Sequence, residues 1–186
     1  MAGINRALLS ESIIIAKASL TSEKPCIFLS HVSEDKESVK EIGKYIMNYG
    51  DIDIYLDIND TELQIAVNNN DPIGITYFIE KGIRSSTHLM CLYSEKTVRS
   101  WWVPYEIGYG KRSSAEVSSL KLKGNVELPA YLKISEMLLG TESLNRYLEK
   151  ISKKVLTTRG YKQINESLIS HSASPHPLDN YLDWKK

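Results

Sequence analysis

Residues 25–30, PCIFLS, form a short uninterrupted apolar run that ends in a serine. Such a run is typical of a strand buried on both faces, as in the middle of a parallel sheet. A polar turn, HVSED, follows, and the segment KESVKEIGKYIMNYG at 36–50 then places Val39, Ile42 and Ile46 at helical spacing. We therefore expect a buried strand followed by an amphipathic helix.

The same alternation of strand and helix continues along the chain. Predicted strands are DIDIYLD at 51–57, THLMCLYS at 87–94, VSSLKLK at 117–123 and ELPAYLKI at 127–134. Predicted helices are DPIGITYFIEKGIR at 71–84, WWVPYEIGYGKRS at 101–113 and TESLNRYLEKISKKVL at 141–156. The polar segment INDTELQIAVNNN at 58–70 is expected to be a loop. Alternation with short turns predicts an α/β fold, a parallel sheet with helices on both faces.

The two ends of the chain fall outside this pattern. Residues 1–20 have apolar residues at helical spacing, so residues 1–22 are expected to hold an accessory helix. The main domain is then expected over 23–156, with a loosely structured C-terminal tail at 157–186 that Trp184 anchors.

Composition excludes several classes of function. The chain has 23 basic and 23 acidic residues among 186, so its net charge is zero. This balance argues against nucleic-acid binding and against adhesion to an anionic membrane surface. No apolar run approaches the ~20 residues of a membrane span.

Cys26 and Cys91 lie in strand-like apolar runs, which predicts buried free thiols and a cytoplasmic location. His171 and His176 lack ligand partners at metal-binding spacing, so no metal site is expected.

Parallel sheets bind ligands at the carboxyl ends of their strands, near the point where the strand order reverses. Polar residues stand at the ends of the first three predicted strands: Ser30 and His31 after the first, Asp57 after the second and Ser94 after the third. Turn and helix capping is an alternative role for these residues, and for Asp57 it is the one that the residue type favours.

The segment SWWVPYEIGYGKRSS at 100–114 holds two of the three tryptophans directly before one carboxylate, Glu106. A helix that starts at Pro104 would place Glu106 in its first turn, where the helix dipole favours the ionised carboxylate. A helix that starts near Ser100 would instead make Trp102 and Glu106 neighbours on one face. By residue type alone, a helical glutamate is more often a solvated surface group and a tryptophan more often a core or interface anchor.

Four segments, taken in chain order, resemble a TIR domain, the Toll/interleukin-1 receptor module, of bacterial type. They are FLSHVSEDK, IYLD, DPIGITYFIEKGIRSSTHLMCLYS and SxWxxxE (Ser100, Trp102, Glu106). The resemblance covers roughly residues 25–155 and is sharpest between Gly74 and Glu106. It implies a flavodoxin-like three-layer sandwich with a mainly parallel sheet of about five strands.

Many bacterial and plant members of this family cleave NAD at the nicotinamide glycosidic bond with the glutamate of the third helical region. The resemblance therefore implies that Glu106 is catalytic and that NAD+ is a substrate rather than a cofactor. Ser30, His31, Asp57, Ser94 and Trp102 are the expected substrate contacts. The family also implies self-association through the domain. In Thoeris-like anti-phage systems, a nucleotide product activates a separate effector.

The chain departs from the family pattern at two places. His31 and Val32 stand where some NAD-cleaving members have arginine, and TELQIAVNNN replaces a glycine-containing loop. Two alternative functions therefore stay open: a recruitment module without chemistry, and a nucleoside deoxyribosyltransferase-like enzyme with Glu106 as the nucleophile.

Overall fold

The sheet forms the centre of the molecule. A computed structural model describes residues 2–9, 24–159 and 175–184. Its five strands are all parallel and lie in the order β2-β1-β3-β4-β5. The strands are β1 (Cys26–Ser30), β2 (Asp53–Tyr55), β3 (His88–Tyr93), β4 (Glu116–Lys121) and β5 (Glu136–Leu138). This is the flavodoxin-like strand order, and the prediction of a mainly parallel five-stranded α/β sandwich is confirmed.

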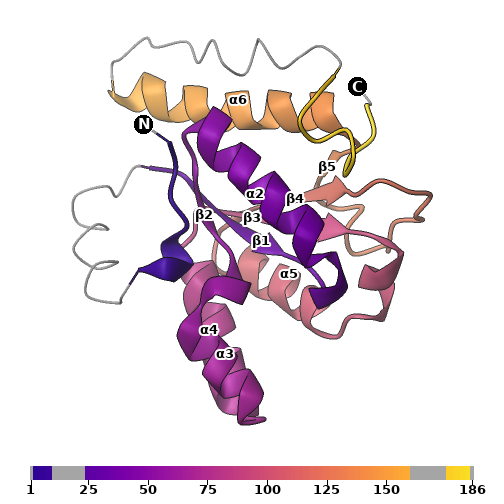
Figure 1. Cartoon of the computed structure of the whole chain (residues 1–186). Helices are drawn as coiled ribbons and strands as arrows, with labels where there is room; N and C mark the ends of the chain where they lie inside the picture. Colours follow the sequence, from indigo (N-terminus) through magenta and orange to yellow (C-terminus); the bar gives the residue numbers. More distant parts are fainter. Residues whose placement is uncertain (1, 10–23, 160–174, 185–186) are drawn as a thin grey trace.

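Helices cover both faces of the sheet (Figure 1). The α-helices are α2 (Lys36–Gly50), α3 (Thr61–Asn68), α4 (Pro72–Arg84), α5 (Trp102–Arg112) and α6 (Thr141–Arg159). The described residues also contain four short 3-10 helices: η1 (Arg6–Leu8), η2 (Ser33–Asp35), η3 (Asp57–Asn59) and η4 (Glu95–Arg99). The helices at 36–50, 71–84, 101–113 and 141–156 were therefore predicted correctly to within a few residues.

Alternation along β1 divides the core into two layers. Ile27 and Leu29 pack with the apolar residues of α2 and α6, whereas Cys26 and Phe28 pack with those of α3, α4 and α5. Both faces of the strand are fully buried, because successive side chains of a strand point to opposite faces and each face carries helices. Cys26 and Cys91 are buried free cysteines, as predicted.

The segment predicted to be a loop at 58–70 contains the helix α3. The Asp60 side chain caps it by accepting hydrogen bonds from the backbone N–H groups of Glu62 and Leu63, at 3.0 and 3.1 Å. Leu63 and Ala66, three residues apart, are the buried positions of α3, which lies beside α4. A helix as short as α3 is stable here because these two residues pack against the neighbouring helix α4.

The strand predicted at 127–134 is also corrected. Pro129 and Ala130 instead open two tight turns, in which Leu132 donates to the Pro129 carbonyl and Lys133 to the Ala130 carbonyl. Leu132 is buried as part of this turn. The fifth strand lies further on, at Glu136–Leu138, where its backbone pairs with β4.

Residues 2–9 do not form the predicted N-terminal helix. They run beside the edge strand β2, where Ile54 donates a hydrogen bond to the Ile4 carbonyl at 2.9 Å and Asn5 forms a bridge with Ile54. The Arg6 guanidinium also lies 3.0 Å from the Asp53 carboxylate. The open backbone groups of an edge strand therefore bind Ile4 and Asn5 in extended form, and the 3-10 helix η1 follows directly. The rest of the predicted helix, at 10–23, lies outside the described residues.

Residues 175–184 pack against the domain, but the side chains that anchor them are not the predicted Trp184. Leu178 and Leu182 are buried in the core layer of α2 and α6. The His176 ring is buried and makes hydrogen-bond contact with the Tyr45 hydroxyl at 3.0 Å. Trp184 stays 42% exposed.

Candidate active site

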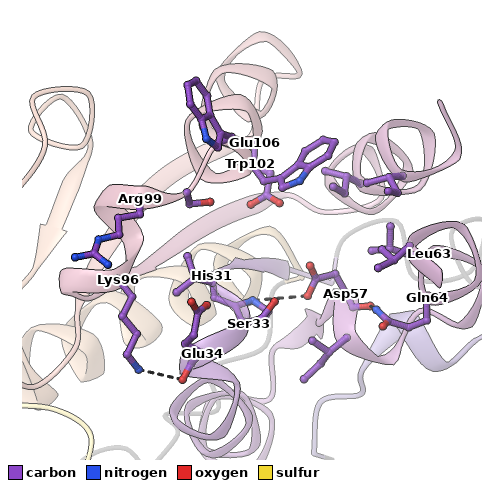
Figure 2. A pocket seen from close by; sticks show the side chains of 17 residues that line it. His31, Ser33, Glu34, Asp57, Leu63, Gln64, Lys96, Arg99, Trp102 and Glu106 are labelled. Carbon is purple, nitrogen blue, oxygen red and sulfur yellow. Dashed lines mark hydrogen bonds and ion pairs between the residues drawn. The ribbon is translucent and has the colours of Figure 1, made fainter. Parts of the chain in front are cut away.

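The strand order reverses between β1 and β3, whose following helices α2 and α5 lie on opposite faces of the sheet. A crevice opens at the carboxyl ends of parallel strands at such a point. A cavity of about 450 Å³ lies here, lined by His31 and Asp57 from the ends of β1 and β2 and by Trp102 and Glu106 from α5. Four of the six predicted site residues therefore share one cavity (Figure 2).

Glu106 projects from α5 toward the end of β1. The residue is only 3% exposed, although it lines the cavity. The Ser30 hydroxyl, which is also buried, donates a hydrogen bond to Glu106 Oε2 at 2.5 Å. Ser30 therefore fixes the orientation of the carboxyl group from the neighbouring strand.

The start of α5 decides between the two helix positions considered from the sequence. The helix begins at Trp102, and the Ser100 hydroxyl accepts a hydrogen bond from the Val103 backbone N–H at 3.2 Å. Pro104 stands in the first turn, where its missing N–H leaves no partner unsatisfied. Trp102 and Glu106 are thus four residues apart on one helix face, and Glu106 lies beyond the first turn.

The start of α5 excludes the first-turn position that would favour an ionised Glu106. Burial and, to a smaller extent, the nearby Asp57 carboxylate together raise the pKa of Glu106 from an ordinary 4.5 to about 8, while the hydrogen bond from Ser30 opposes the shift. Because the residue lies past the first turn and is desolvated, burial outweighs the helix dipole.

His31 and Asp57 form a second pair in the cavity. The imidazole Nδ1 lies 2.9 Å from the Leu29 carbonyl oxygen and 3.6 Å from Asp57 Oδ1. Among the residues that the structure describes, that Asp57 oxygen is buried without a hydrogen-bond partner. Burial raises the pKa of the Asp57 carboxyl, and the charge of His31 opposes this shift.

A comparison with known families decides the family. A sequence model of the family described as "Thoeris protein ThsB, TIR-like domain" matches residues 28–126, more than half of the chain. The chain belongs to this family. The resemblance to a bacterial TIR domain of Thoeris type is thereby confirmed.

Solved structures of related folds match the TIR-like chain as well. The crystal structure of the TIR domain of the Toll-related receptor TRR-2 from Hydra magnipapillata is 13% identical, with a TM-score of 0.52, over 69% of this chain and 96% of that one. The SEFIR domain of interleukin-17 receptor B is 9% identical, also with a TM-score of 0.52, over 72% of this chain and 98% of that one. At these identities the likeness shows the fold alone. Among curated proteins, none matches the chain significantly.

Ser94 lies apart from the cavity of the TIR-like domain. Its hydroxyl accepts a hydrogen bond from the Lys96 backbone N–H at 3.2 Å, as a cap of η4, and donates to the buried Asp35 carboxylate at 2.5 Å. Ser94 lines a second hollow of about 400 Å³, which shares Lys96 with the cavity but does not include Glu106. The geometry therefore assigns Ser94 the capping role rather than a place beside Glu106.

Two cations at the cavity were missed by sequence reasoning. Lys96 and Arg99 belong to η4, and both line the cavity on one side of His31 (Figure 2). The Lys96 ammonium is held by the Asp35 carboxylate at 2.9 Å and the Glu34 carbonyl at 3.1 Å. The Arg99 guanidinium is exposed and makes no hydrogen bond or ion pair within the described chain.

In the described ranges, no three or more His, Cys, Asp or Glu side chains are placed to hold a metal ion. His171 lies outside these ranges. None of the described helices has the length and apolar character that a membrane crossing requires.

Proposed function

We propose that this TIR-like domain cleaves NAD+ at the nicotinamide glycosidic bond and releases nicotinamide with ADP-ribose or a cyclic ADP-ribose isomer. The observation that carries the proposal is the buried Glu106 carboxyl, fixed by Ser30 at 2.5 Å and lining a cavity at the switch point of the sheet. In a Thoeris-type protein, the nucleotide product would serve as a signal for a separate effector.

The chemistry needs only one carboxylate. The nicotinamide of NAD+ is a cationic pyridinium, so it departs as a neutral molecule with the electron pair of the broken C–N bond and requires no acid. The transition state instead needs negative charge beside the developing oxocarbenium ion of the ribose. Glu106 supplies that charge, and Ser30 holds the carboxylate in place. The pyridinium cation itself favours the ionised form of Glu106, because a nearby positive charge lowers a carboxyl pKa.

The walls of the cavity fit the rest of a dinucleotide. The Trp102 indole is 41% exposed and lies one helical turn from Glu106, where it provides a flat apolar surface for nicotinamide. Arg99 lines the cavity with an exposed guanidinium that provides positive charge for the pyrophosphate, whereas the Lys96 ammonium beside it is already paired with the Asp35 carboxylate. A nucleoside carries no phosphate, so Arg99 favours a dinucleotide over the deoxyribosyltransferase alternative.

The test is incubation of the purified chain with NAD+ at high protein concentration, with nicotinamide and product mass followed by chromatography and mass spectrometry. Nicotinamide release supports the proposal, and the mass separates hydrolysis from cyclisation. Base exchange on a deoxynucleoside without NAD+ cleavage would support the transferase instead. Absence of both reactions would favour a recruitment module.

Arg99→Ala is expected to raise KM for NAD+ about tenfold with little change in kcat, because a charge-assisted hydrogen bond to phosphate contributes about 1.5 kcal/mol or more. Steady-state kinetics on NAD+ measure this. Arg112→Ala, an exposed arginine in the last turn of α5, is the matched control and is expected to leave KM unchanged. Equal KM values for Arg99→Ala and the parent chain would remove Arg99 from the phosphate site.

We further propose that self-association covers the mouth of the cavity. Trp101 lines the cavity and is 92% exposed, which is unusual for so large an apolar side chain.

The specific activity of the parent chain is accordingly expected to rise with protein concentration. Trp101→Ala should shift that rise to at least about tenfold higher concentration, because tryptophans at the centre of interfaces contribute 2 kcal/mol or more. Activity and light scattering across a dilution series provide the measurement. Ile134→Ala, which removes an exposed apolar side chain elsewhere, is the control. A concentration-independent parent activity would contradict self-association.

A further inference from the structure

His31 has a defined tautomer. Its side chain is 2% exposed, and Nδ1 lies 2.9 Å from the Leu29 carbonyl oxygen. A carbonyl oxygen only accepts hydrogen bonds, so Nδ1 must carry the hydrogen. In the neutral ring the lone pair is then on Nε2, the nitrogen that is not held by the backbone. His31 therefore offers a proton acceptor at a cavity that Glu106 also lines.

The Asp57 carboxyl is placed to stabilise the charge that His31 gains when Nε2 takes a proton. Its Oδ1 lies 3.6 Å from His31 Nδ1, too far for a direct hydrogen bond but close enough for charge attraction. Burial raises the pKa of Asp57, while a positive imidazole lowers it. A positive imidazole and a negative Asp57 carboxylate therefore stabilise each other at this distance.

We propose that His31 is the general base of the second half of the reaction. Once the C–N bond to nicotinamide has broken, a hydroxyl group of water or of a sugar attacks the ribosyl carbon. The new C–O bond takes its electron pair from that oxygen, and the released proton goes to His31 Nε2. This inference rests on the proposed NAD+ cleavage.

The two halves of the reaction make opposite demands on a single carboxylate. Glu106 must stay negative while the oxocarbenium ion exists, and it would lose that charge if it also accepted the proton of the nucleophile. Figure 2 shows the His31 ring between Asp57 and the η4 side of the cavity, apart from the Glu106 carboxyl. A separate base there lets Glu106 remain ionised until the new bond has formed.

The experiment uses azide, a nucleophile that has no proton to lose. His31→Asn keeps an N–H donor near the position of Nδ1, so the bond to the Leu29 carbonyl is retained, but it removes Nε2. At a fixed azide concentration we expect the ratio of ADP-ribosyl azide to ADP-ribose to rise on the order of 10²-fold over the parent chain, because general bases contribute about 10²–10⁴-fold. Asp57→Asn is expected to give an intermediate ratio, and Arg112→Ala the parental one.

The outcomes separate this inference from the proposed function. Nicotinamide release by the parent chain together with an unchanged azide ratio in His31→Asn overturns the role of His31 alone. Absence of release by the parent chain overturns both. Nitrogen-15 NMR of the imidazole rings tests the tautomer without any activity: Nδ1 is expected to be protonated and Nε2 bare in the neutral ring. The opposite tautomer would overturn the inference, and thermal unfolding shows whether each variant is folded.

Discussion

Glu106→Gln is expected to release nicotinamide from NAD+ at least about 10³-fold more slowly than the parent chain, because the variant has no negative charge to place beside the oxocarbenium ion. The substitution is nearly isosteric. The glutamine amide oxygen can still accept the Ser30 hydrogen bond that now reaches Glu106 Oε2 at 2.5 Å. The loss should therefore appear in kcat, with KM little changed, as expected when an interaction of the transition state is removed.

The measurement is nicotinamide release by both chains under the same assembled conditions. Glu127→Gln, which changes an exposed glutamate in the loop before β5, is the matched control and is expected to keep the parental rate. Equal release by the parent chain and Glu106→Gln would show that another group supplies the charge. If neither chain released nicotinamide although both were folded and assembled, the recruitment module would become the better account of the fold.

The elements that the sequence predicted well are those with two strong signals at once. PCIFLS is apolar throughout and is followed by a helix with a clear face, so β1 and α2 appear where they were expected. Asp71 and Pro72 mark the start of α4 with a cap and a first-turn proline. By contrast, α3 buries only Leu63 and Ala66, too few residues to show a helical period within a polar segment.

The burial of the site residues was harder to predict from the sequence than their positions in the fold. The sequence places Glu106 on a helix at the correct edge of the sheet, and Ser30, His31 and Asp57 at strand ends, because connectivity alone brings those points together. It does not indicate that Glu106 is buried and held by Ser30, and so it does not reveal that burial raises the pKa of this carboxyl. Ser94 also stands at a strand end, but its side chain caps η4 and lines a different hollow. Arg99 lies in a short connection that has no periodicity.

The burial of Glu106 has a second consequence, which does not depend on activity. Its pKa is about 8 in the folded chain and close to its ordinary 4.5 in the unfolded chain. Below pH 4.5 the group is protonated in both states and has no effect on the pH dependence of stability. Between pH 4.5 and about 8 only the folded state retains the proton, so the free energy of unfolding falls as the pH rises. Above pH 8 this loss is complete, at up to roughly 5 kcal/mol.

Glu106→Gln is therefore expected to be more stable than the parent chain at pH 9, by several kcal/mol, and equally stable near pH 4.5. Denaturant unfolding of both chains across this range measures the difference. Asp57 titrates in both chains, so its own contribution largely cancels in the comparison, apart from its repulsion of Glu106. Glu127→Gln should track the parent chain at every pH. Parallel stability curves for Glu106→Gln and the parent chain would show that Glu106 is solvated in solution.

If Glu106→Gln gains stability and loses catalysis, the result explains why a carboxylate occupies this buried position. A glutamate that only supported the fold would be expected to destabilise the chain when it is replaced by a neutral side chain. A group that destabilises the folded state above pH 4.5 but is required for turnover is instead held in place for its chemistry. The two measurements on Glu106→Gln thus separate a catalytic carboxylate from a structural one, since only the catalytic role predicts opposite signs for activity and stability.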